Sequence, residues 1–457
     1  MRTSYVIDSN ILLLDAHNLH AIGDDKDTIV IPETVLDEVD AKKSGLGEVA
    51  FQAREFGRLM TQATFTGKVS KNEVNYLNYQ VNGRIVVIVS IDKYPSFDGM
   101  DKKVINDRKI IECAKRYQEV IQPGEEVVLL TNDVACGIRA QSLGVSSRQL
   151  REVNDTPVSY SGRVILNDMD FRSIHGKPIT SYDSAYTHSK FNYVIENKET
   201  GQIKLATIKH GIVNVIGKES EQELRKQEVN PQNSGQLFMS RAIQDQTIPL
   251  VVVEALSGSG KTLMALSNAV KLVKTNSPYD TIIYVRASVN DVEEKEEVGF
   301  LKGSLDEKNE VYFHPMLDSL AYIAKSRIKN KKLKGKELEE EIARTTERII
   351  EDCNIHMLTG LGMRGRTFEN AVVIIDEAQN MSRASMRKVL TRFGKHCKIV
   401  VIGSNRQIDH PYITKYTNGL SVLLDAATQE QMIDMHVVQL DKVVRSDFAE
   451  FAEKIFD

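Results

Sequence analysis

The run SGSGKT at residues 257–262 has the residue types and spacing of a loop that binds the phosphates of a nucleotide. In the pattern G-x-x-x-x-G-K-[ST], backbone N–H groups surround a phosphate, a lysine neutralises its charge, and a hydroxyl holds Mg²⁺. Gly260, Lys261 and Thr262 supply the second half of this pattern, and Ala255 stands where the pattern has its first glycine. Alanine is the next smallest residue, so we expect a modest cost unless this position needs a positive φ. The loop residues before Gly260 are small and flexible: Ser257, Gly258 and Ser259.

Two adjacent carboxylates, Asp376 and Glu377, follow the apolar run VVII and form a second element of the same candidate site. After such a strand, an aspartate orders Mg²⁺ with its water shell, and the next glutamate polarises the water that attacks the phosphate. A further apolar run, KIVVIG, leads towards Asn405, Arg406 and Gln407, where a polar side chain can sense the γ-phosphate. These elements together predict hydrolysis of a nucleoside triphosphate.

Four acidic residues in the first 150 residues form a second candidate site. Asp8 and Asp133 follow apolar runs, whereas Glu38 and Asp107 lie in helical patterns. Because parallel strands present their carboxyl ends at one edge of a sheet, we expect the four side chains to converge. Converging carboxylates repel one another by about 4 kcal/mol per pair at ~4 Å. A divalent cation relieves this repulsion, and oxygen ligands suit Mg²⁺ or Mn²⁺, which activate water for phosphodiester hydrolysis.

An alternative interpretation is that these acidic residues only cap helices or lie in solvated loops. The position on the helix is the least certain, because Asp37 and Asp40 flank Glu38 and compete for its role.

Hydrophobic patterning predicts an α/β protein that positions both sites. In residues 1–150, four apolar runs alternate with helical patterns, which indicates a parallel sheet with covering helices. In residues 235–457, a β-branched run, the phosphate loop and an amphipathic pattern follow one another in the order strand, loop, helix. Residues 158–218 contain short strand-like runs without helical periodicity, which predicts a small β-rich, barrel-like domain that serves as a spacer and RNA platform. The polar residues 219–234 are predicted to be a linker.

Composition narrows the function classes further. The 457 residues carry a net charge of −4, so binding of nucleic acid would need local basic patches. The sequence has neither an apolar run of membrane-spanning length nor the pattern of a signal peptide, so we expect no membrane partner and a cytoplasmic location. The four cysteines are far apart and are predicted to be buried thiols rather than a zinc site.

One dense basic run, KSRIKNKKLKGK at residues 325–336, has two interpretations. Lysine and arginine fill seven of its twelve positions, and the acidic run ELEEE follows. The lysines can bind an RNA backbone, or the two runs can pair with each other on a solvated helix. The sequence leaves both open.

At its four carboxylates the N-terminal region resembles the PIN-domain ribonucleases. The resemblance covers about residues 1–145 and rests on the motifs VIDSN, PETVLDEVD, INDRKI and LLTND. It implies metal-dependent cleavage of single-stranded RNA, with Thr131 or Asn132 as supporting polar groups. The metal ligands that it implies are Asp8, Glu38, Asp107 and Asp133.

The C-terminal half, about residues 225–457, resembles the PhoH-like ATPases, which are related to superfamily-one helicases. The matching motifs are QNSGQ, ALSGSGKT, VRAS, EEVGFLKGSLDEK, MRGRTFEN, VVIIDEAQN, LTRFG, GSNRQID and DKVVRS. Joined to the PIN-like region, this half resembles the fused PIN and PhoH proteins. That resemblance implies ATP-dependent RNA unwinding coupled to RNA cleavage, with Mg²⁺ or Mn²⁺ at both sites. The alternative is a nucleotide-gated RNA-binding scaffold with an inactive nuclease site.

The same resemblance assigns roles to individual residues. It implies that Gln236 reads the adenine, that Lys261 and Thr262 hold phosphates and Mg²⁺, and that Gln407 is the sensor. Ser404 stands where the family has an aspartate, which implies a slow ATPase that still binds nucleotide. The resemblance also implies a homo-oligomer, such as a hexameric ring. Candidates for contacts to phosphate or RNA are Arg286, Arg364, Arg366, Arg392 and Arg445.

Overall fold

The structure is a computed structural model with two compact units, one made of the described residues up to 150 and the other of the described residues from 158 onward. Each unit is described by itself. The residues that the structure describes are 2–24, 26–44, 48–97, 99–121, 124–150, 158–275, 277–287, 305–328, 333–359, 367–409, 413, 415, 418–429, 434–444, 451 and 455.

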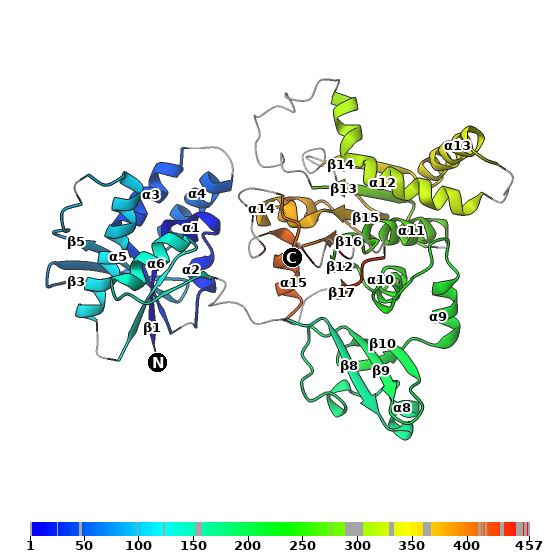
Figure 1. Ribbon diagram of the computed structural model, residues 1–457, viewed down its shortest axis with the longest axis horizontal. Coiled ribbons are helices and arrows are strands. Elements are labelled where there is room, and N and C mark those ends of the chain that lie inside the picture. The colour runs from blue at the N-terminus through cyan, green and yellow to red at the C-terminus, as the bar shows by residue number, and fades with distance from the viewer. Residues whose placement is uncertain are drawn as a thin grey trace. The chain divides into compact units, whose positions relative to one another are not determined.

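The first unit is a seven-stranded mixed sheet with covering helices (Figure 1). The strand order is β3-β4-β5-β2-β1-β6-β7, and the strands from β5 to β7 run parallel. The strands are β1 (Thr3–Ile7), β2 (Thr28–Pro32), β3 (Thr64–Lys71), β4 (Val74–Val81), β5 (Arg84–Ile91), β6 (Glu126–Leu130) and β7 (Ser147–Arg148). The helices are α1 (Ser9–Leu14), α2 (Asn18–Ala21), α3 (Glu33–Lys42), α4 (Glu48–Thr61), α5 (Lys102–Val120) and α6 (Val134–Ser142).

The four apolar runs of this region form strands β1, β2, β5 and β6, as predicted. The antiparallel hairpin β3–β4 was not predicted, because its sequence is polar and β3 is mostly exposed. Pairing of β4 along the whole length of β5 extends the sheet there. The hairpin makes the sheet mixed rather than purely parallel.

The second unit is built around a six-stranded parallel sheet of order β14-β13-β15-β16-β12-β17. Its strands are β12 (Leu250–Ala255), β13 (Thr281–Arg286), β14 (Ile355–Thr359), β15 (Ala371–Asp376), β16 (Lys398–Gly403) and β17 (Met435–Leu440). Its helices are α10 (Ser234–Gln244), α11 (Lys261–Lys274), α12 (Leu305–Arg327), α13 (Lys336–Asp352), the 3₁₀ helix η5 (Ala378–Asn380), α14 (Arg383–Leu390) and α15 (Gly419–Ala426).

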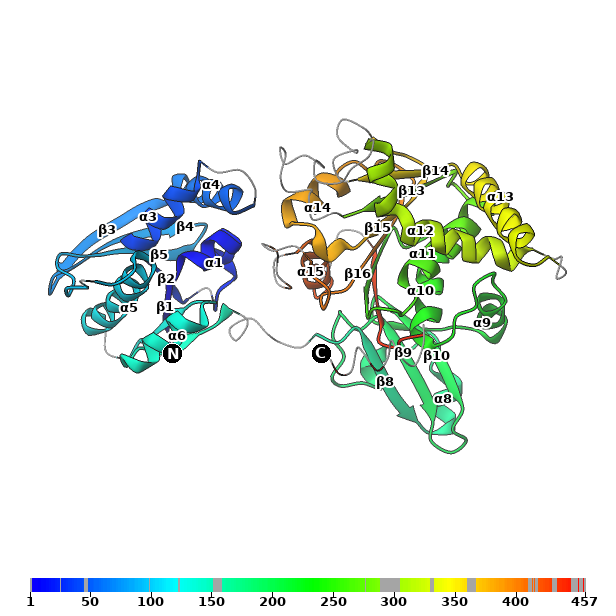
Figure 2. The same cartoon turned by 45° about the horizontal axis from the view of Figure 1, so that its top comes forward.

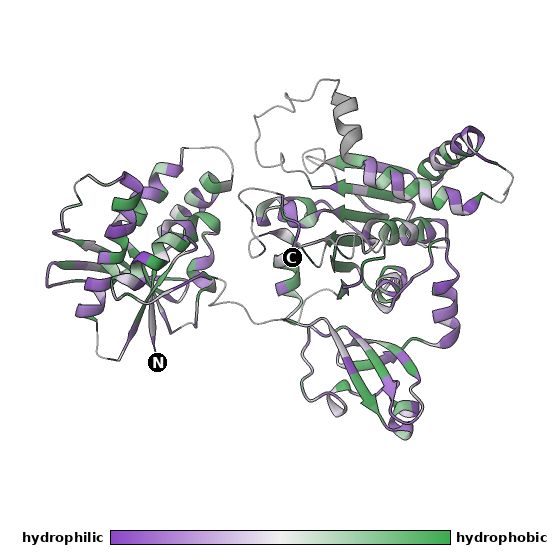
Figure 3. Ribbon diagram, in the orientation of Figure 1, coloured by the Kyte–Doolittle hydropathy of each residue, from purple (hydrophilic) through white to green (hydrophobic). Residues whose placement is uncertain are grey.

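Alternating residues of this sheet enter two separate cores. One core joins the sheet to α10, α11 and α12, and the other joins it to α14 and α15. Figures 1 and 2 show these helix groups on opposite faces of the sheet, and Figure 3 shows its strands coloured mainly as hydrophobic. Burial on both faces explains the nearly continuous apolar sequence of the strands.

A small four-stranded sheet of order β11-β10-β9-β8 packs against this larger sheet within the same unit. Asn192 donates from Nδ2 to the carbonyl of Val437 (2.8 Å), and Lys209 pairs with Asp434 (2.9 Å). The sheet is open rather than a closed barrel, because no pairing joins its two edge strands among the described residues. Its elements are β8 (Ser161–Leu166), α8 (Asp168–Ser173), η1 (Ile179–Ser181), β9 (Asn192–Asn197), β10 (Ile203–Lys209) and β11 (Ile212–Val215).

The segment 219–234, expected to be a linker, instead contains most of helix α9 (Lys218–Arg225). Leu224 and Val229 are buried in the core around α10 and α11. These two apolar side chains anchor an otherwise polar segment to the larger sheet's helices. Among the described helices, none is both long and apolar enough to cross a membrane.

A buried lysine joins strand β16 to helix α10. Lys398 is 0 % exposed, and its Nζ donates to the carbonyls of Ala242 and Asp245, both at 2.7 Å, at the end of the helix. Burial lowers the pKa of Lys398 to about 7. A neutral amine still donates two hydrogen bonds, so deprotonation keeps both contacts.

This lysine should give the free energy of unfolding a positive dependence on pH. Between pH 7 and the ordinary lysine pKa of about 10.4, the unfolded chain binds a proton that the folded chain lacks. Stability therefore rises through this window, by at most ~1.4 kcal/mol per pH unit. Denaturant unfolding of the wild type and Lys398→Met at pH 7, 8, 9 and 10 measures the difference in slope. Equal slopes in the two proteins would show that folding does not lower the pKa of Lys398.

Candidate nucleotide and carboxylate sites

The phosphate loop lies between β12 and α11, as the sequence predicts. Gly258 has φ = 68° and Gly260 has φ = 80°, so both use the left-handed region that favours glycine. Gly258 accepts a hydrogen bond from the backbone N–H of Val444 (3.0 Å), which ties the loop to the segment after β17. Ala255 is the buried last residue of β12 and has no positive φ. The backbone here does not require the glycine that the pattern usually has.

The structure brings the predicted catalytic residues to the start of α11. Thr262 Oγ1 donates to Asp376 Oδ2 (3.0 Å), and Lys261 Nζ lies 3.5 Å from Glu377 Oε1. Glu377 donates from its backbone N–H to Asp376 Oδ1 (2.9 Å). Burial raises the pKa of Asp376, the charge of Glu377 raises it further, and Lys261 lowers it. The hydroxyl and the carboxylate that would share Mg²⁺ are thus already in contact.

Glu377 itself is held in an unusual conformation. Its φ of 54° lies in the left-handed region, which is unfavourable for a residue with a side chain. Gln379 Nε2 donates to Glu377 Oε2 (2.6 Å) and to the carbonyl of Gln407 (2.8 Å). Gln379 Oε1 accepts from the backbone N–H of Ser404 (3.0 Å). Gln379 therefore links Glu377 to the segment predicted to sense the γ-phosphate.

The space for Gln379 depends on Gly403. A Cβ at Gly403 would lie 2.5 Å from Gln379 Oε1, which is closer than atoms approach without moving. Sequence reasoning missed Gln379, although its place two residues after Glu377 in the run DEAQN is a signal that could have indicated it.

Gln236 has a different environment from the one expected. Its Nε2 donates to the carbonyl of Ser259 (2.9 Å), and its Oε1 accepts from the backbone N–H of Gln232 (2.7 Å). The side chain is 3 % exposed, so here its amide supports the phosphate loop from α10. Reading an adenine would require Gln236 to exchange one of these partners.

The predicted arginines divide into three groups. Arg286 lies beside Asp376 in the register of β13 and β15, and its buried Nη1 has no hydrogen-bond partner among the described residues. Arg392 follows α14, and its carbonyl accepts from the N–H of Phe368 (3.0 Å). An unpartnered buried donor is costly, so Arg286 has the strongest reason to bind a phosphate. Arg364, Arg366 and Arg445 lie outside the described residues.

In the first unit, Asp8 follows β1, and the residue is 6 % exposed. Its Oδ2 accepts hydrogen bonds from Thr131 Oγ1 (2.6 Å) and Asn10 Nδ2 (2.6 Å). Burial raises the pKa of Asp8, and the negative charge of Glu38 raises it further. Of the two polar groups that the resemblance to PIN-domain ribonucleases implies, Thr131 is the one that supports Asp8. Asn132 instead uses its Oδ1 to accept from the N–H of Leu150 (3.2 Å).

The other three carboxylates lie near Asp8 but already have partners. Arg139 Nη1 contacts Asp107 Oδ2 (2.6 Å), and Lys103 Nζ contacts Asp133 Oδ2 (3.1 Å). Burial raises the pKa of Asp107, and the charges of Asp8 and Asp133 raise it further. Glu38 Oε1 accepts from Asn106 Nδ2 (2.6 Å). The charge of Glu38 thus acts on Asp8, and the charges of Asp8 and Asp133 act on Asp107. Sequence reasoning missed the basic partners Arg139 and Lys103.

Asp133 has the capping role that the alternative interpretation of the acidic residues gives it. Its Oδ1 accepts from the N–H groups of Ala135 (2.9 Å) and Cys136 (3.2 Å) at the start of α6. Burial alone would raise the pKa of Asp133, but the Cys136 N–H and Lys103 outweigh it, so the pKa is lowered. Asp133 is therefore ionised and N-caps α6, with Lys103 beside its other oxygen.

The oxygen donors of this carboxylate cluster fit a hard divalent cation in their chemistry. A cation would also relieve the repulsion that raises the pKa of Asp8 and Asp107. In the described part of the chain, no three His, Cys, Asp or Glu side chains lie close enough together to hold a metal ion. For a cation to bind, the ion pairs of Lys103 with Asp133 and of Arg139 with Asp107 would have to break.

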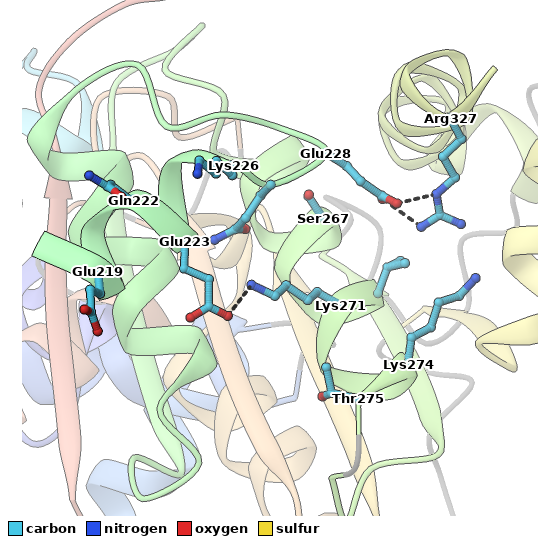
Figure 4. Close-up of a pocket in the computed structure, with 12 residues that line it drawn as sticks. Glu219, Gln222, Glu223, Lys226, Glu228, Ser267, Lys271, Lys274, Thr275 and Arg327 are labelled. Carbon is cyan, nitrogen blue, oxygen red and sulfur yellow. Dashed lines mark hydrogen bonds and ion pairs between the residues drawn. The ribbon is translucent and has the colours of Figure 1, made fainter. Parts of the chain in front are cut away.

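A separate cavity of about 570 Å³ lies between α9, α11 and the end of α12 (Figure 4). Most of its charged side chains pair with one another. Arg327 contacts Glu228 twice at 2.7 Å, and Lys271 lies 3.9 Å from Glu223. Arg327 belongs to the basic run at residues 325–336. Because it forms an ion pair with Glu228 within the same unit, this residue supports internal pairing rather than RNA binding. Residues 329–332 of that run lie outside the described residues.

The parallel sheet, the phosphate loop and the paired Asp376 and Glu377 define a P-loop nucleotide-binding protein, joined here to an N-terminal α/β unit with an acidic cluster. Residues 228–457 match the family described as PhoH-like protein, and residues 5–151 match the family described as PIN domain. The chain belongs to the PhoH-like protein family and carries an N-terminal PIN domain. The predicted α/β fold class and the resemblance to fused PIN and PhoH proteins are confirmed.

Similar proteins support this assignment along the whole chain. The chain is 26 % identical to Protein PhoH2 of Bacillus subtilis (strain 168) over 99 % of both chains. It is 32 % identical to Protein PhoH of Escherichia coli (strain K12), over 47 % of this chain and 54 % of that protein. A solved structure, the Pif1 helicase from Candida albicans, covers 50 % of this chain and 43 % of its own at 14 % identity and a TM-score of 0.24. At that score the likeness supports no argument.

Proposed function

We propose that the chain hydrolyses ATP to remodel or unwind RNA, and that its PIN unit cleaves single-stranded RNA at a metal-dependent site. The observation that carries the proposal is the contact of Thr262 with Asp376 beside Lys261 and Glu377, at the first turn of α11. A hydroxyl, two carboxylates and an amine at a phosphate loop are the groups that in-line transfer of a phosphoryl group to water needs.

In this proposal each residue of the nucleotide site has one role. Lys261 and the loop N–H groups bind phosphate oxygens, and Arg286 supplies a further cation beside them. Glu377 accepts a proton from the attacking water, and its bond from Gln379 Nε2 fixes its orientation. The chemistry that Mg²⁺ supplies, when Thr262 and its carboxylate partner hold it, is neutralisation of charge between the phosphates.

The roles in the PIN unit follow from the same chemistry. The carboxylates of Asp8, Glu38, Asp107 and Asp133 would hold Mg²⁺ or Mn²⁺, whose contribution is to activate a water for attack on the phosphodiester. Thr131 and Asn10 keep Asp8 oriented through their hydrogen bonds to its Oδ2. The partners of this activity are single-stranded RNA and further copies of the chain in a ring, such as a hexamer.

A second candidate function is a nucleotide-gated RNA-binding scaffold with an inactive nuclease site. It is favoured by the ion pairs of Arg139 with Asp107 and of Lys103 with Asp133, which neutralise two carboxylates without a metal. The two candidates differ in whether the PIN unit cuts RNA.

The test uses the full chain, end-labelled single-stranded RNA, Mg²⁺ or Mn²⁺, and assays with and without ATP. Phosphate release together with RNA cleavage that ATP stimulates is the expected result. Phosphate release with intact RNA in every lane would contradict the nuclease function and favour the RNA-binding scaffold. The absence of phosphate release, with or without RNA, would contradict the ATPase on which both candidates depend.

A further inference from the structure

Tyr284 is a fully buried tyrosine whose hydroxyl meets Asp376. Its side chain is 0 % exposed, and its hydroxyl donates a short hydrogen bond to Asp376 Oδ2. The same oxygen accepts from Thr262 Oγ1 (3.0 Å), whereas Asp376 Oδ1 accepts from the backbone N–H of Glu377 (2.9 Å). Both oxygens of the carboxylate are therefore held by donors from three places in the fold: strand β13, helix α11 and Glu377, the residue before η5.

Strand pairing explains how the hydroxyl reaches this oxygen. In the parallel register of β13 and β15, Tyr284 lies opposite Ile374 and Arg286 lies opposite Asp376. Residues two apart share a face of a sheet, so Tyr284 and Asp376 point to the same side, towards α11 and α12. The ring extends along that face and packs edge-on against Phe313 of α12, with the ring centroids 6.2 Å apart.

Packing alone does not explain a tyrosine at this place. The surrounding core is apolar, and a buried hydroxyl without a partner costs free energy, so phenylalanine would fill the same space at less risk. The hydroxyl is useful only because Asp376 accepts its hydrogen bond. Neither hydrolysis nor phosphate binding, as proposed above, uses Tyr284 directly.

We propose that Tyr284 is a positioning residue for Asp376, which holds the carboxylate in the orientation that faces Thr262 and the Mg²⁺ that accompanies ATP. The inference depends on the proposed ATPase function. Without the tyrosine hydroxyl, Oδ2 has Thr262 as its remaining described donor, and Thr262 would leave this contact if its hydroxyl turned to hold Mg²⁺. The carboxylate would then be free to rotate away from the orientation that faces the cation.

Tyr284→Phe tests this, because it removes one oxygen atom and keeps the ring against Phe313. We expect the Mg²⁺ concentration for half-maximal ATP hydrolysis to rise about tenfold, the size typical for loss of a group that orients a metal ligand. We also expect the Mg²⁺-dependent binding of a non-hydrolysable ATP analogue to weaken about tenfold. Binding of that analogue without Mg²⁺ should remain at the wild-type level.

Tyr193→Phe is a matched control within the same unit. Tyr193 is also 0 % exposed, and its hydroxyl donates to Asp183 Oδ2 (2.7 Å) in the small sheet. This variant also removes a hydrogen bond from a buried tyrosine to an aspartate, so it should lower the Tm and leave both Mg²⁺ titrations unchanged.

Two outcomes would overturn the inference. In one, Tyr284→Phe lowers the Tm, as Tyr193→Phe does, but both Mg²⁺ titrations remain as in the wild type. Tyr284 would then only stabilise the fold. In the other, the analogue binds equally with and without Mg²⁺ in both Tyr284→Phe and the wild type. Failure of the wild type to release phosphate would instead contradict the proposed function, and the analogue titration would still report on Tyr284.

Discussion

Glu377→Gln should lower the rate of ATP turnover by about 10²–10⁴-fold, the range that a general base typically contributes, while ATP binding stays near the wild-type level. Glutamine has the same shape but cannot take a proton from the attacking water. The charge of Glu377 also raises the pKa of Asp376, so its removal eases the crowding of negative charge beside the phosphates. We therefore expect binding to be unchanged or slightly tighter, with the loss confined to turnover.

The measurement is phosphate release at saturating ATP, together with direct titration of ATP into each protein. Glu228→Gln is the matched control, because Glu228 is an ion-paired glutamate of the same unit that lines the separate cavity with Arg327. It should turn over ATP at the wild-type rate. A Glu377→Gln protein with wild-type turnover would remove Glu377 from the mechanism and leave the general base unassigned.

Much of this nucleotide site could be predicted because its residues are fixed by local sequence. The loop at Lys261 and the pair Asp376 and Glu377 each follow an apolar strand directly, and carboxyl ends of parallel strands meet at one edge of a sheet. Gln379 and Tyr284 could not be assigned in this way. Their partners depend on rotamers and on the strand order β13-β15-β16, which the spacing along the chain does not reveal.

The same limit applies to the PIN domain. Strand ends placed Asp8 and Asp133 correctly in the fold, and helical patterns placed Glu38 in α3 and Asp107 in α5. Sequence spacing said nothing of Lys103 and Arg139, because these cations reach the carboxylates from other turns of α5 and from α6. Which carboxylates repel one another, and which are neutralised by Lys103 or Arg139, depends on the folded arrangement of the side chains.

Asp8→Asn should reduce cleavage of single-stranded RNA by the PIN unit by about 100-fold, the upper end of the loss that is typical when a metal ligand is no longer oriented. Asparagine keeps an oxygen that accepts from Thr131 Oγ1 and Asn10 Nδ2, so the local fold is retained. It cannot supply the negative charge that a divalent cation needs from its ligand.

The stability of this variant distinguishes a role in function from a role in folding. Because burial and Glu38 raise the pKa of Asp8, the folded chain binds a proton more tightly there than the unfolded chain does. The ionised carboxylate therefore costs stability as the pH rises through that raised pKa. Replacing it with neutral asparagine should leave the Tm at pH 7 unchanged or higher.

Asp27→Asn provides the comparison that decides between these roles. Asp27 is 5 % exposed, and its carboxylate accepts from the N–H groups of Thr3 (2.9 Å) and Asp24 (2.9 Å) at the amino end of β2, away from the carboxyl-end cluster. Its replacement should lower the Tm and preserve cleavage, the reverse of Asp8→Asn. If Asp8→Asn lost cleavage only together with stability, Asp8 would serve the fold. If RNA were cut at the wild-type rate by a stable Asp8→Asn protein, the carboxylate cluster would not be the nuclease site.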